Sequence, residues 1–97
     1  MANSSVAIQV LPSVNNDEQL LSVVDEVIAY IKSFNLPTVV GPFETTIEGD
    51  YDELMEILKG CSKICIEKGS NGVMTYAKIN YNPHGVFTID SKIAKHQ

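Results

Sequence analysis

The sequence predicts an α+β domain in which two helices cover one face of a four-stranded antiparallel sheet. Two stretches carry apolar residues at helical spacing, four others alternate or are rich in β-branched residues, and turn residues separate them. The resulting order is β-α-β-β-α-β. With right-handed crossovers, this order gives the split β-α-β, or ferredoxin-like, sandwich with strand order 4-1-3-2. We expect residues 1–97 to form one such domain with a short C-terminal extension.

The first strand is predicted at residues 6–11, where apolar side chains alternate with others. Pro12 is expected to end it, because proline cannot donate to a ladder. A helix should follow, since Asn15 and Glu18 have the spacing of an N-cap and its partner, and it should stop near Asn35. Its predicted apolar stripe comprises Leu20, Leu21, Val24, Val27, Ile28, Ile31 and Phe34.

Two further strands are predicted at residues 38–40 and 44–49, on either side of the Gly41-Pro42 turn. Ile47 marks the buried face of the second of these strands, and Thr45 shares that face by alternation. Asp50 then has the position of an N-cap for a helix over residues 51–68. The apolar stripe of this helix is predicted to comprise Leu54, Ile57, Leu58, Cys61, Ile64 and Cys65. Gly60, inside it, costs about 1 kcal/mol relative to alanine, which suggests close packing on the sheet.

The last strand is predicted at residues 73–81, followed by a turn at 82–85 and an extended stretch at 86–89. Asp90 or Ser91 is expected to cap a short terminal helix. Because both long helices cover the same face, the opposite face should be open. The open face is predicted to carry Ala7, Gln9, Leu11, Glu44, Thr46, Glu48, Met74, Tyr76, Lys78 and Asn80. Such a mixed face is typical of an interface between copies, a ligand floor or both.

Composition excludes several classes of function. The net charge is -5, and all 7 basic residues are lysines, which disfavours binding of nucleic acid or polyphosphate. Neither a membrane span nor a signal peptide is expected, so a cytoplasmic location is predicted. Cys61 and Cys65 have the spacing of buried core thiols, and we expect no metal site. His84 and His96 have no neighbouring nucleophile that would indicate catalysis.

Several residues of the open face have the chemistry to recognise a small heterocycle. Glu48 could accept hydrogen bonds from ring or amino N–H groups, with Thr46 and Gln9 supplying the rest. The alternative is a solvated face on which Glu48 pairs with Lys78. Tyr76 could stack on an aromatic ring together with Met74, or simply pack at an interface. Lys78 could bind an anionic group or neutralise a carboxylate.

The pattern Gly41-Pro42-x-x-Thr45-x-Ile47-Glu48-Gly49, followed by an acidic helix start, resembles the thiamine-binding, ferredoxin-like family. Val10-Leu11-Pro12 and Ala77-Lys78-Ile79 are also similar to that family, and the resemblance spans residues 6–93. It implies a sandwich that associates into dimers or tetramers through sheet contacts. It also implies binding of thiamine or its hydroxymethylpyrimidine half, without known catalysis.

The leading hypothesis is therefore a non-enzymatic binding module for thiamine or hydroxymethylpyrimidine that forms a homodimer or homotetramer and carries no other cofactor. Thiamine is a cation with an aminopyrimidine ring, which acidic and aromatic side chains suit. The ligand-binding residues are predicted to be Gln9, Thr45, Thr46, Glu48 and Tyr76. The alternative is a structural or regulatory homo-oligomer in which the open face is only an interface.

Overall fold

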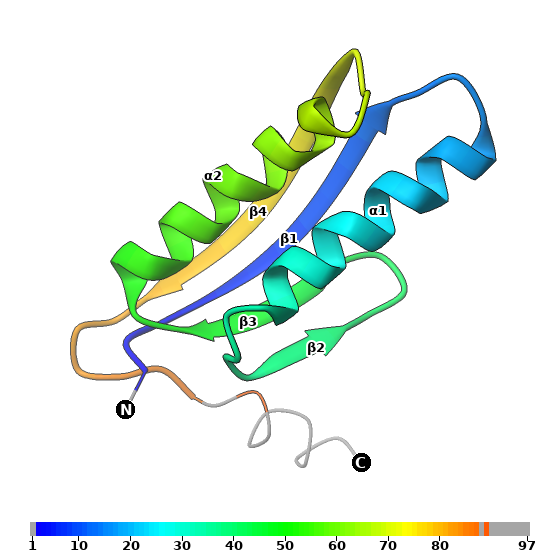
Figure 1. Ribbon diagram of the computed structural model, residues 1–97. Coiled ribbons are helices and arrows are strands. Elements are labelled where there is room, and N and C mark those ends of the chain that lie inside the picture. The colour runs from blue at the N-terminus through cyan, green and yellow to red at the C-terminus, as the bar shows by residue number, and fades with distance from the viewer. Residues whose placement is uncertain (1, 88, 90–97) are drawn as a thin grey trace.

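The computed structural model describes residues 2–87 and residue 89. Its elements are β1 (Ser4–Ser13), α1 (Asp17–Lys32), β2 (Thr38–Val40), β3 (Thr45–Gly49), α2 (Tyr51–Glu67) and β4 (Gly72–Tyr81). The sheet order is β2-β3-β1-β4, and every pair of neighbours is antiparallel. Both helices lie on the same face of the sheet (Figure 1). The predicted ferredoxin-like sandwich is confirmed, while the predicted terminal helix lies outside the described residues.

The first helix starts one residue later than predicted, with Asn16 rather than Asn15 as its N-cap. The Oδ1 atom of Asn16 accepts a hydrogen bond from the N–H of Gln19 at 2.8 Å. In return, Oε1 of Gln19 accepts from the N–H of Asn15 at 3.1 Å. Gln19 therefore satisfies the N–H one residue before the N-cap, a variant of the reciprocal bond of a capping box.

The first strand does not end at Pro12 but continues to Ser13. In a strand, consecutive residues direct their backbone groups to opposite neighbours. The N–H of Asn82 donates to the carbonyl of Asn3, and that of Asn71 to the carbonyl of Ser13, so the odd-numbered residues of β1 face β4. Proline at an even-numbered position removes no bond from the β1–β4 ladder, which is why the strand tolerates it.

The core lies between the helices and the sheet. It comprises Val6, Ile8, Val23, Val27, Ile31, Ile47, Leu54, Ile57, Cys61 and Cys65. The buried stripe of α1 differs in part from the predicted one. Val23, which was not predicted, is buried, whereas Leu21 and Phe34 are exposed. The stripe of α2 agrees better with the prediction, and its N-cap Asp50 accepts from the N–H of Glu53 at 3.4 Å.

Gly60 packs against α1 and not against the sheet, which corrects the prediction. A Cβ atom at this position would overlap the hydroxyl and ring of Tyr30. The Tyr30 ring also meets Phe34 edge-on, with ring centroids 5.1 Å apart. Burial raises the pKa of the Tyr30 hydroxyl. The glycine therefore gives the tyrosine ring room at the contact between the two helices.

We predict that Gly60→Ala destabilises the protein, although helix propensity alone would stabilise it by about 1 kcal/mol. Overpacking costs roughly 1–3 kcal/mol, so urea denaturation should show a net loss of about 1 kcal/mol. In a Tyr30→Ala background the same change should become stabilising, because the overlapping ring is gone. A Gly60→Ala protein more stable than the parent would show that Tyr30 moves aside at no cost.

Candidate functional site

The tip of the β2–β3 hairpin is a tight turn formed by Pro42 and Phe43. The N–H of Gly41 donates to the carbonyl of Glu44 at 2.9 Å and closes the turn. A Cβ atom on Gly41 would lie 2.9 Å from that carbonyl oxygen, closer than real Cβ contacts allow. Glycine at this position therefore permits the close approach of the two strands at the tip.

This hairpin tip diverges from β1. The β1–β3 pairing starts at Ser4 and Gly49 and stops at Ile8 and Thr45. The β1–β4 pairing continues as far as Ser13. Beyond Ile8, β1 therefore has a paired neighbour on the β4 side only, and a space opens between it and the hairpin tip.

We call this space the sheet gap. On the helix side it is a hollow of about 110 Å³. The hollow is lined by Ile8, Gln9, Val10, Val24, Val27, Ile28, Ile31, Val40, Gly41, Pro42, Phe43, Glu44 and Thr45. On the open face it adjoins a depression of about 480 Å³, lined by Gln9, Phe43, Glu44, Tyr76, Ala77 and Lys78. Because Gln9, Phe43 and Glu44 line both, the two spaces lie on either side of the same hairpin tip.

The depression contains one ion pair. The Nζ atom of Lys78 lies 3.5 Å from Oε1 of Glu44, with the lysine side chain 81% exposed and the glutamate 36%. Exposed pairs of this kind contribute at most about 1 kcal/mol, so either charge can be given up to a ligand at little cost. The alternative in which Lys78 pairs with Glu48 is wrong.

Three of the predicted ligand-binding residues lie at the sheet gap. Gln9 and Tyr76 are opposite each other in the β1–β4 register, and both line the depression. Thr45 is buried on the helix side and lines the hollow. Thr46 pairs with Ala7 on the open face, as its strand phase predicted, but it lines neither space.

Glu48 lies elsewhere, at the other end of the open face. It pairs with Ser5, four residues from Gln9 and hence about 13 Å along β1. Glu48 is only 7% exposed, and its Oε2 atom accepts a hydrogen bond from the N–H of Ile89 at 2.8 Å. The segment that carries Ile89 therefore covers Glu48 at this end of the open face, and Glu48 does not meet Gln9 or Tyr76.

Sequence reasoning missed Phe43 and did not select Glu44. Phe43 is 79% exposed, and an aromatic residue in a Gly-Pro turn was the available signal for it. Glu44 was placed on the open face, but strand phase could not distinguish it from Glu48. Only the point at which the β1–β3 ladder ends shows which of the two carboxylates lies beside Gln9.

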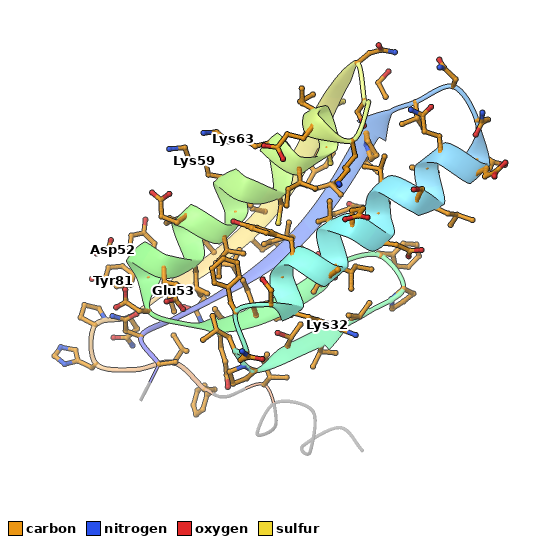
Figure 2. The ribbon with its side chains drawn as sticks, viewed as in Figure 1. Lys32, Asp52, Glu53, Lys59, Lys63 and Tyr81 are labelled. Atoms are coloured by element: carbon orange, nitrogen blue, oxygen red, sulfur yellow. The ribbon has the colours of Figure 1, made fainter. Side chains whose placement is uncertain are left out.

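Neither the two cysteines nor the lysines of α2 line the hollow or the depression. Cys61 and Cys65 are core residues, and burial together with the neighbouring Cys65 raises the pKa of the Cys61 thiol to about 12, so it stays protonated near neutral pH. Lys59 and Lys63 project from α2 (Figure 2). Within the described part of the chain, no cluster of three or more His, Cys, Asp or Glu side chains could hold a metal. No helix in that part is long and apolar enough to cross a membrane.

Comparison with known proteins identifies the family. A family model described as thiamine-binding protein matches residues 6–97. A UPF0045 protein of Clostridium perfringens is 46% identical over 97 residues, covering 100% of both chains.

Solved structures agree with this match. A Thermotoga maritima protein provisionally assigned to thiamine biosynthesis or salvage superposes with a TM-score of 0.85 at 32% identity, covering 97% of this chain and 98% of that one. A Bacillus cereus domain of unknown function gives a TM-score of 0.86 at 31% identity, covering 97% and 89%. The chain therefore belongs to the thiamine-binding protein family.

Proposed function

We propose that this protein binds thiamine or its hydroxymethylpyrimidine moiety at the sheet gap, and that it does so without catalysis. The observation that carries the proposal is the meeting of an amide, a carboxylate and two aromatic rings around one opening of the sheet. Gln9, Glu44, Phe43 and Tyr76 supply these groups. Membership of the family, and the thiamine-related description of the Thermotoga maritima protein, support the choice of ligand.

The chemistry of the lining residues suits a cationic, aromatic ligand. The carboxylate of Glu44 would attract the thiazolium charge, and a cation close to the faces of Phe43 and Tyr76 is favoured by their ring quadrupoles. The amide of Gln9 can donate to and accept from ring nitrogens and amino groups. In this proposal Glu44 takes the role that the sequence suggested for Glu48. Gln9, Thr45 and Tyr76 remain ligand-binding residues, as the sequence predicted.

The proposal includes no chemical step. The residues that line the hollow and the depression include no serine, cysteine or histidine, so the Ser–His and Cys–His pairings of nucleophile and base are absent there. A depression of about 480 Å³ is within the roughly 300–1,000 Å³ range of small-molecule sites. Carriage, sensing or storage of the vitamin in the cytoplasm would need no more than this.

Self-association is the second part of the proposal. Leu11 and Met74 are opposite each other in the β1–β4 register, next to the pair of Gln9 and Tyr76. Leu11 is 46%, Met74 60% and Tyr76 50% exposed. Burying these three side chains against a second copy would remove apolar surface from water at the uncovered end of the open face.

Glu44→Gln should weaken thiamine binding about tenfold to a hundredfold, because it removes the attraction between the carboxylate and the thiazolium charge. For charges about 4 Å apart this attraction lies between about 1 kcal/mol in water and about 4 kcal/mol near a protein surface. Glu48→Gln is the matched control and should change the affinity little, since Glu48 lies outside the gap. Isothermal titration calorimetry measures both. A loss of affinity confined to Glu48→Gln would move the site to the other end of the face. Absence of heat and of any thermal shift with millimolar thiamine or hydroxymethylpyrimidine would refute the binding proposal.

Light scattering at high micromolar concentration should give a dimer or tetramer of the 10.6 kDa chain. Met74→Glu should shift the mass toward the monomer by placing charge in the proposed interface. Ile66→Glu is the control, because Ile66 is 49% exposed on α2, on the helix side of the sheet. A parent protein that is monomeric throughout this range would contradict the proposed self-association.

A further inference from the structure

The backbone of Val10 faces the sheet gap. The odd-numbered residues of β1 direct their N–H and C=O groups to β4, so the even-numbered ones face β3. The β3 side agrees independently. The N–H of Glu48 donates to the carbonyl of Pro37, beside β2, which leaves Ile47 and Thr45 facing β1. The hydrogen-bonded pairs of this ladder are accordingly Ser4 with Gly49, Val6 with Ile47 and Ile8 with Thr45.

Val10 is the next even-numbered residue of β1, and no residue of β3 pairs with it. The ladder with β3 ends at Ile8, and no backbone hydrogen bond joins Val10 to the hairpin tip at residues 41–44. Val10 nevertheless lines the hollow. Its N–H and C=O therefore form a donor and acceptor pair directed into the gap, and Pro12, the following even-numbered residue, contributes only a carbonyl.

We propose that the backbone N–H and C=O of Val10 bind the hydrogen-bonding edge of the ligand's aminopyrimidine ring, an inference that rests on the proposed function. In an antiparallel ladder these two groups serve the C=O and N–H of one residue of the neighbouring strand. A 4-aminopyrimidine carries a ring-nitrogen acceptor beside an exocyclic amino donor, so its edge offers the same complementary pair. The ring would thus replace the residue of β3 that the diverging hairpin withdraws.

The surroundings of Val10 fit a flat ring held in the plane of the sheet. One face of such a ring would meet the apolar side chains that α1 contributes to the hollow, among them Val24 and Ile28. The other face would look toward the open side, where Phe43 and Tyr76 line the depression. The ring substituent could then extend into the larger space beside Glu44, which suits a thiazolium cation.

Amide hydrogen exchange measured by NMR tests this directly. Without ligand, the Val10 amide should exchange much faster than those of Val6 and Ile8, which face the same side of the same strand. Saturating thiamine or hydroxymethylpyrimidine should slow Val10 at least about tenfold more than it slows Val6 and Ile8, which gain only the global stabilisation that ligand binding confers on the folded chain.

The failures of the two proposals are distinguishable in this experiment. Calorimetric binding of thiamine without protection of Val10 would overturn the role of Val10 and leave the proposed function standing. Absence of binding would overturn both. A Val10 amide that is already as slow as Val6 in the free protein would overturn the inference, and loss of that protection on dilution would show that a second copy fills the gap.

A proline substitution gives a second readout. Val10→Pro removes the N–H donor without breaking a bond to β4. Val10→Ala is its control, because it keeps the N–H while losing a similar amount of side-chain packing. The two variants should therefore be about equally stable. Gln9→Pro should destabilise clearly more, because Gln9 faces β4. Thiamine should bind Val10→Pro about tenfold more weakly than Val10→Ala. Equal affinities would overturn the proposal, and if Val10→Pro fails to fold, the exchange measurement decides.

Discussion

The alternating direction of the backbone groups along β1 is the constraint on which the rest of the structure depends. This central strand pairs with β4 over residues 4–13 but with β3 over residues 4–8 only. Its phase decides which side chains join the core and which line the open face, and it also decides where proline is tolerated. The same phase directs the N–H and C=O of Val10 toward the side of β3, where the hairpin tip diverges and no strand pairs with it.

Local chemistry made most of the fold predictable from the sequence. Apolar periodicity, turn residues and the Asp50 cap identify all six regular elements in order, since each depends on residues close together in the chain. The errors arose where a residue far away in the sequence determines the local structure. Pro12 continues a strand because of its phase relative to β4, and Gly60 makes room for Tyr30 on the other helix. The neighbouring sequence shows neither the phase of Pro12 relative to β4 nor which residue packs against Gly60.

The candidate site was less predictable for the same reason. Strand alternation correctly placed Gln9 and Tyr76 on one face, because alternation is a property of each strand alone. It could not show that Ile89 reaches Glu48 from 41 residues away, nor that the hairpin tip leaves β1 beside Glu44. A side chain's face follows from its own strand, but what covers that face depends on segments far along the chain.

A backbone N–H and C=O that have no partner in the middle of a sheet also link the stability of the protein to ligand binding. Buried N–H and C=O groups without a partner cost roughly 1–3 kcal/mol each, so such a pair persists only where water or a ligand can reach it. Val10 is half-buried and lines an open hollow, which satisfies that condition. A ligand that supplies the missing partner binds only the folded chain and therefore stabilises it. The departure of the hairpin from β1 removes backbone bonds from the sheet of the free protein, and under our proposal it leaves the groups that a ligand would bind.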